Sequence, residues 1–150
     1  MNGSKEAFAL ALAERFPEFR KAYEEHLAGY GEILGHVFFD VLHRALVPLL
    51  RLNEDREKIG KYIEFLEDMY ANGDGEVRNV VEVTILEVLG DEETVLRNAF
   101  SYFSEDLMTA AQSVEKGWGR RDIRIWHKGG RVRYDWDWPR RSFFRDAVMR

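Results

Sequence analysis

Hydrophobic side chains recur at intervals of three and four residues through the first 116 residues, the spacing that is typical of amphipathic helices. The pattern predicts six helices in this part of the chain. Their expected ranges are 4–15, 17–27, 32–52, 54–70, 76–89 and 91–116. The helix over 32–52 is apolar around most of its circumference, so we expect it to be central and to contact neighbours on several sides.

Single residues mark the expected helix ends. Ser4 is an N-cap candidate for the first helix, and Asn53 is expected to cap the helix that follows it. Pro48 should kink the central helix or end it early, because proline has no backbone N–H to donate. Gly90 follows the helix over 76–89 as its expected C-cap.

Segment 76–89 is rich in β-branched residues, and propensity alone would permit a strand. Its apolar positions nevertheless follow helical spacing without a break, so we expect a helix. Together with the helix before it, this segment has the character of one helical-repeat unit, and HEAT-like pairing is possible.

After residue 117 the hydrophobic period changes from that of a helix to two. Apolar residues then alternate with charged ones on both sides of Gly129-Gly130, which predicts a β-hairpin with a two-glycine turn. Pro139 should end the hairpin, and residues 140–150 are expected to form a short basic helix. The predicted fold is therefore mainly α: a single-domain helical bundle over 1–116, with the hairpin and tail of 117–150 packed on the same domain.

Composition narrows the class of protein. The 150 residues are 45% hydrophobic and 33% charged, which fits one globular domain rather than a disordered chain. Cysteine is absent, so disulfides, thiolate nucleophiles, thiolate zinc sites and iron–sulfur ligation are excluded. The apolar runs are too short for a bilayer span, and only Lys5 precedes the first of them, so we expect no membrane association, no secretory signal and a cytoplasmic location.

The net charge of −5 conceals a division of the chain. Residues 1–116 carry twelve Lys or Arg against twenty-three Asp or Glu, a net charge of −11, whereas residues 117–150 carry ten against four, a net charge of +6. Such asymmetry influences partner choice more than fold. The alternative is that the two parts simply neutralise each other within one fold.

His36, Asp40 and His43 share one face of the predicted central helix and are the weak candidates for a metal site. Three ligands on one straight helix extend over roughly 10 Å, too far for all of them to reach one ion without another element. We therefore expect no metal, no cofactor and no catalytic residue, and keep a metal-dependent enzyme at these residues as an alternative.

The C-terminal segment, residues 117–150, holds all four tryptophans and most of the arginines of the whole chain. This combination is typical of protein interfaces and of surfaces that bind single-stranded nucleic acid. Carboxylates between the arginines would repel phosphates, so nucleic acid is not the expected partner and stays an alternative. Part of the aromatic face would instead close the hairpin over the helices. The residues expected to bind a partner are Trp118, Arg121, Arg124, Trp126, Arg131, Arg133, Asp135, Asp137, Glu64 and Asp68.

Two stretches of sequence, Tyr30–Asp40 and Tyr70–Val83, resemble a family of small helical bacterial proteins of unassigned function. Members carry a Leu-Pro-His-Val-Phe-Phe-Gly-Asp-like stretch and a later Asn-Gly-Asp-Glu-Glu-Val-x-Asn-like stretch, and the resemblance covers about residues 17–112. This chain has Gly35 in place of the proline and lacks the glycine before Asp40. Proteins of this kind resemble the immunity proteins that accompany polymorphic bacterial toxins.

The resemblance implies a cytosolic immunity protein without catalysis of its own. It would bind a cognate toxin domain, of a basic nuclease type, and cover its active site. The acidic charge of residues 1–116 suits such a partner. A nucleic-acid-binding regulator that uses the hairpin is one alternative, and a metal-dependent enzyme at His36, Asp40 and His43 is the other.

Overall fold

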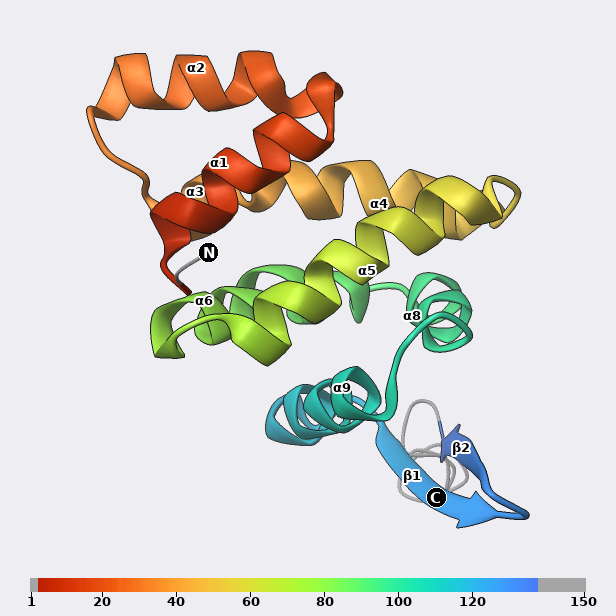
Figure 1. Cartoon of the computed structure of the whole chain (residues 1–150). Coiled ribbons are helices and arrows are strands. Elements are labelled where there is room, and N and C mark those ends of the chain that lie inside the picture. The colour runs from red at the N-terminus through yellow and green to blue at the C-terminus, as the bar shows by residue number, and fades with distance from the viewer. Residues whose placement is uncertain (1–2, 138–150) are drawn as a thin grey trace, which may run out of the picture.

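The computed structural model describes residues 3–137 and is mainly helical, with a C-terminal antiparallel hairpin, as predicted (Figure 1). Within this range no helix is both long and apolar enough to cross a membrane. The helices are α1 (Lys5–Arg15), the 3-10 turn η1 (Pro17–Phe19), α2 (Arg20–Tyr30), α3 (Gly35–Phe38), α4 (Asp40–Leu52), α5 (Arg56–Asn72), α6 (Gly75–Val80), the π-helical segment η2 (Val81–Leu86), α7 (Glu87–Leu89), α8 (Glu93–Phe100) and α9 (Glu105–Trp118). The strands are β1 (Asp122–Lys128) and β2 (Arg131–Asp137). The predicted basic helix over 140–150 and Trp138 lie outside the described residues.

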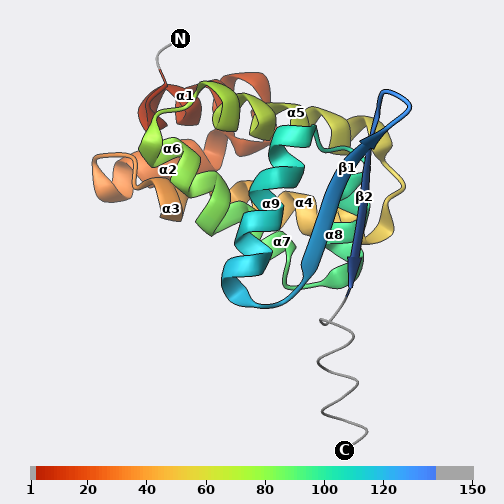
Figure 2. The ribbon, with the colours of Figure 1, turned by 90° about the horizontal axis from the view of Figure 1, so that it is seen from below.

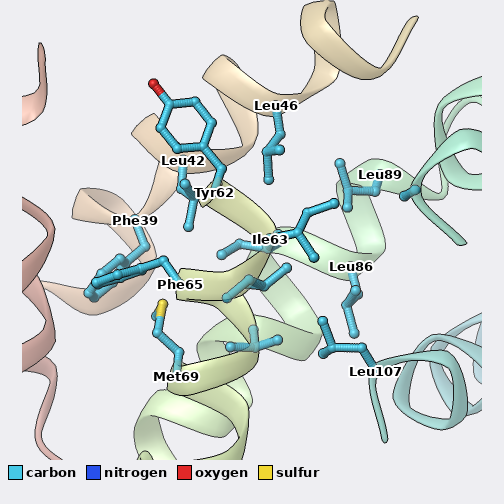
Figure 3. Packing of buried hydrophobic residues seen from close by; sticks show 14 of the residues in the cluster. Phe39, Leu42, Leu46, Tyr62, Ile63, Phe65, Met69, Leu86, Leu89 and Leu107 are labelled. Carbon is cyan, nitrogen blue, oxygen red and sulfur yellow. The ribbon is translucent and has the colours of Figure 1, made fainter. Parts of the chain in front are cut away.

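The helices α4 and α5 run across the middle of the molecule, with α1 and α2 on one side and α8, α9 and the hairpin on the other (Figure 1). Buried apolar side chains from α4, α5, η2, α7 and α9 pack together in the interior of the molecule, as Figure 3 shows for Leu46, Ile63, Leu86 and Leu107. One continuous core therefore extends from the first helix to Trp136 of the hairpin.

The helix predicted over 32–52 ends at Leu52 as expected, but its start and its continuity are wrong. It begins only at Gly35 and is interrupted at Phe39, which separates α3 from α4. Pro48 does not end it early, because α4 continues to Leu52 and buries leucines on the face away from the exposed proline. Asn53 is the C-cap of α4, in the left-handed conformation with φ 53°, and not an N-cap.

The helix predicted over 91–116 is two helices, α8 and α9. Ser104 starts the second one, because its hydroxyl oxygen accepts a hydrogen bond from the Leu107 backbone N–H at 3.2 Å. The Glu67 carboxylate of α5 fixes this turn by accepting the Ser104 N–H at 2.6 Å. Phe100 and Phe103 contact each other across the break, with ring centroids 5.5 Å apart, so the apolar pattern continues although the helix does not.

The β-branched segment 76–89 is helical throughout, as its periodicity predicts, and Gly90 follows it as the C-cap of α7. Its middle part, η2, is π-helical. The preceding helix α5 packs against α6 and η2.

The hairpin has the predicted alternation and turn. Gly129 and Gly130 both have positive φ, 60° and 76°, as a type I′ turn requires. On the inward face, Phe100 of α8 contacts Trp136 and Tyr134, with ring centroids 4.9 Å and 5.0 Å away. Strand β1 lies along α9 (Figure 2), and these ring contacts connect β2 with the end of α8.

Candidate partner-binding surfaces

One hollow on the described surface lies where the end of α1 and the turn η1 meet α5. Its volume is about 770 Å³. Five carboxylates and three cationic side chains line it, and we call it the acidic groove. Its lining residues are Arg15, Phe16, Glu18, Asp55, Glu57, Lys58, Lys61, Tyr62, Glu64 and Asp68.

Aromatic rings line the acidic groove beneath its charged rim. The Tyr62 side chain is 2% exposed, and its ring centroid is 5.0 Å from that of Phe16. Its hydroxyl donates to the Glu18 carboxylate at 2.5 Å, which lowers the pKa of Glu18. Burial, aided by Glu18, raises the pKa of the Tyr62 hydroxyl. Glu18 therefore stays ionised and Tyr62 neutral around pH 7.

Glu64 and Asp68, two of the residues predicted to bind a partner, both line the acidic groove. Glu64 is exposed on α5. Asp68 accepts a hydrogen bond from the Asn72 amide at 2.7 Å, and the Arg15 guanidinium lies 3.9 Å from its other oxygen. The structure thus brings these two carboxylates together with Glu18, which the sequence did not single out.

The outward face of the hairpin is the second candidate surface. We call its five cationic and aromatic residues the basic face: Arg124, Trp126, Lys128, Arg131 and Arg133. A hollow of about 490 Å³ is lined by four of them together with Gly129. Asp135, also on this face, is paired with Arg124 at 3.2 Å.

Three of the predicted residues in or next to the hairpin, Trp118, Arg121 and Asp137, do not belong to the basic face. Trp118 at the end of α9 is 61% exposed, whereas Trp136 is buried against Phe100. The side chain of Asp137 lies outside the described part of the structure. Arg121 does not lie on the surface as predicted, because it is 0% exposed and belongs to a buried cluster of charges.

The buried charges gather around Glu115 of α9, which is 1% exposed. Its carboxylate accepts hydrogen bonds from Arg121 and from the Arg120 Nε, the latter at 2.7 Å. Arg121 also donates to the backbone oxygen of Gly90 at 2.7 Å, and Arg120 to Asp91 at 2.8 Å. This buried ion cluster attaches the start of the hairpin to the end of α7, so Arg121 stabilises the fold and does not belong to the exposed surface.

The structure does not bring His36, Asp40 and His43 together. Asp40 and His43 are hydrogen-bonded to each other on α4. His36 instead lies on α3, and its Nδ1 is 2.6 Å from the Thr84 hydroxyl. Among residues 3–137 no group of three or more His, Cys, Asp or Glu side chains is arranged to hold a metal ion.

The two stretches that carry the family resemblance meet at His36. The Asn79 amide nitrogen lies 3.4 Å from its Nε2. A Cβ at Gly35 would lie only 3.1 Å from a methyl group of Val80, so α3 and α6 are in close contact there. The stretches therefore form one packed unit, although they are about 40 residues apart in sequence.

Comparison with known proteins identifies one family whose pattern matches this chain. No curated protein and no solved structure matches the chain. The family match spans residues 9–119, from within α1 to the C-cap of α9, and ends before the hairpin begins at Asp122. The chain therefore belongs to the family described as Domain of unknown function (DUF7674).

Proposed function

We propose that this chain is a cytoplasmic immunity protein, without catalysis of its own, that binds a cognate bacterial toxin domain and covers its active site. The toxin domain would be basic and of a nuclease type. The observation that carries the proposal is the acidic groove, in which carboxylates from α5 and η1 surround an aromatic floor.

Charge complementarity is the first support. A nuclease binds a phosphate backbone with lysine and arginine side chains, so its active site presents positive charge. Carboxylates gathered in a hollow focus negative potential at that position. The net charge of −11 on residues 1–116 adds a long-range attraction that would raise the rate of encounter.

The floor of the acidic groove is the second support. One of its own cations already lies over a ring of this floor, because the Lys58 ammonium is 5.8 Å from the Tyr62 ring centroid. An arginine from a partner could bind in the same way, with a carboxylate such as Glu64 accepting its hydrogen bonds. A few such anchors can provide most of the affinity of an interface.

The partner can be isolated from the native host with the tagged full chain, with nuclease treatment, and identified by mass spectrometry. We expect one stoichiometric protein that survives nuclease treatment and arrests growth when it is expressed alone. Recovery of no stoichiometric protein, or of one without toxicity, would refute the proposal.

Binding kinetics of that protein then locate the interface. The variant Glu57→Lys/Glu64→Lys reverses two charges in the acidic groove, and Glu24→Lys/Glu25→Lys reverses two exposed charges on α2, outside it. Each pair includes one glutamate with a lysine four residues away on the same helix, at 3.2 Å and 3.9 Å, so the local losses are matched. We expect the first variant to bind at least about tenfold more weakly, mainly through slower association at low salt, and the second to bind nearly as the wild type does.

A further inference from the structure

The basic face is held in a fixed orientation by contacts that use only the other side of the hairpin. Trp136 and Tyr134 contact Phe100, and the Gln112 amide donates to the backbone oxygen of Ile123 at 2.7 Å. The Glu105 carboxylate lies 3.0 Å from His127. The outward side chains take no part in these contacts and remain exposed to solvent.

Three cations of the basic face have no acidic partner among the described residues. Within residues 3–136, neither Lys128 nor Arg131 nor Arg133 forms an ion pair. Other arginines do, including Arg51 with Glu92 and Arg97 with Glu93. An unpaired group of cations is therefore a property of this surface.

The strand register places two like charges opposite each other, which lowers the stability of the hairpin. Lys128 lies directly opposite Arg131, and like charges in directly opposed positions destabilise an antiparallel pair. The next outward pair is Trp126 opposite Arg133, so an exposed indole lies beside these charges. Trp126 is 43% exposed. An anion that bound between Lys128 and Arg131 would relieve their repulsion.

The hollow in this surface has the dimensions and chemistry for a stacked base beside phosphates. Its volume of about 490 Å³ falls within the range of small-ligand sites, and no carboxylate lines it. We propose that the basic face binds single-stranded nucleic acid, with a base stacked on Trp126 and phosphates contacted by Lys128, Arg131 and Arg133. Aromatic rings beside arginines or lysines are how such strands are bound without sequence preference.

Asp135 on this face does not oppose a phosphate backbone as the sequence suggested. Asp135 is paired with Arg124, two residues along each strand from the pair formed by Trp126 and Arg133 and farther from the turn. Its charge is therefore compensated away from the hollow. The family match ends at Gly119, so this activity would be carried by a part of the chain beyond the matched domain and would be independent of the acidic groove.

The test is fluorescence anisotropy of labelled oligothymidine and oligouridine with the purified full chain over a salt series. With three phosphate contacts, the logarithm of the association constant should fall against the logarithm of salt concentration with a slope of about −2. Trp126→Ala should weaken binding about tenfold, and Arg131→Gln/Arg133→Gln should weaken it further and flatten the slope.

Matched controls separate this surface from general attraction. Trp118→Ala removes a tryptophan that is exposed at the end of α9, outside the basic face, and Lys21→Gln removes an exposed cation on α2; both variants should bind as the wild type does. The absence of binding at low salt would refute the proposal, as would binding that Trp126→Ala and Arg131→Gln/Arg133→Gln leave unchanged. Competition by polyglutamate as strong as that by oligothymidine would also refute it, in favour of an acidic protein ligand. No toxin is present in this assay, so its failure leaves the proposed function untouched.

Discussion

Replacing Gly90 by alanine should destabilise the fold, although the backbone at this position suits any residue. Its φ is −73°, so no left-handed conformation requires glycine there. The obstacle is the buried ion cluster. A Cβ at position 90 would lie 2.5 Å from the Arg120 Nη2 and 2.9 Å from both carboxylate oxygens of Glu115.

The atoms that would meet this methyl group cannot move away cheaply. Glu115 is fully buried and accepts hydrogen bonds from two arginines, and Arg120 also donates to the backbone oxygen of Glu87 at 3.0 Å. Loss of one charge-assisted hydrogen bond combined with overpacking, less the small gain from replacing a glycine, gives a loss of roughly 2 to 4 kcal/mol in the free energy of unfolding.

The control is Gly60→Ala, in the interior of α5, where nothing lies within 4 Å of the added Cβ. This change should raise the free energy of unfolding by up to about 1 kcal/mol, because alanine favours a helix interior over glycine. Urea unfolding followed by circular dichroism measures both variants against the wild type. If Gly90→Ala is as stable as the wild type, the structural account of the buried ion cluster is wrong.

Three further predictions concern other contacts. Tyr62→Phe should cost about 1 kcal/mol at pH 7, because it removes the hydrogen bond to Glu18. That bond lowers the pKa of Glu18, so the stability it gives to the wild type is lost as the pH falls through this pKa, and the variant should lose less stability than the wild type between about pH 5 and pH 3. Parallel pH profiles of the two proteins in urea titrations would contradict this prediction. Asn53→Ala should cost about 1 kcal/mol more than Asn53→Gly, because both variants lose the hydrogen bond that Asn53 accepts from the Tyr102 hydroxyl at 2.7 Å and only the left-handed φ of 53° distinguishes them; equal thermal melting of both variants would disprove the role of that conformation. Trp136→Ala should cost about 3 kcal/mol and Trp126→Ala less than about 0.5 kcal/mol, because only the first side chain is buried; similar losses in urea unfolding would mean that the faces of the hairpin are assigned incorrectly.

The sequence predicted those elements whose signals are local. In the hairpin, strict alternation on both sides of Gly129-Gly130 leaves one register in which the apolar residues share a face. The helix over 76–89 was recognised against its β-branched composition because its apolar spacing is continuous.

Helix breaks were missed where the apolar pattern continues through them. At Phe39 and between Phe100 and Ser104, side chains that fit helical spacing pack into the same core on both sides of the break. A signal existed at Ser104, which precedes two acidic residues in the first turn of α9 and is a typical N-cap. Asn53 shows the converse, because a residue that suits an N-cap also tolerates the left-handed C-cap.

The candidate sites were predictable only in part, because they depend on pairs that are distant in sequence. Glu64 and Asp68 are one turn apart on a single helix, and their shared surface could be predicted. The bond between Tyr62 and Glu18 joins residues 44 positions apart. The burial of Arg121 depends on a backbone oxygen 31 positions away, and nothing in the local pattern indicates it.

Growth protection tests the central claim most directly. The candidate toxin is expressed in a bacterial host with the wild-type chain, with Glu57→Lys/Glu64→Lys or with Glu24→Lys/Glu25→Lys, at equal protein levels checked by immunoblot. We predict that the wild type and the α2 variant restore growth and that the groove variant does so poorly. Growth arrest in the presence of the wild-type chain, or full protection by the groove variant, would contradict neutralisation through the acidic groove.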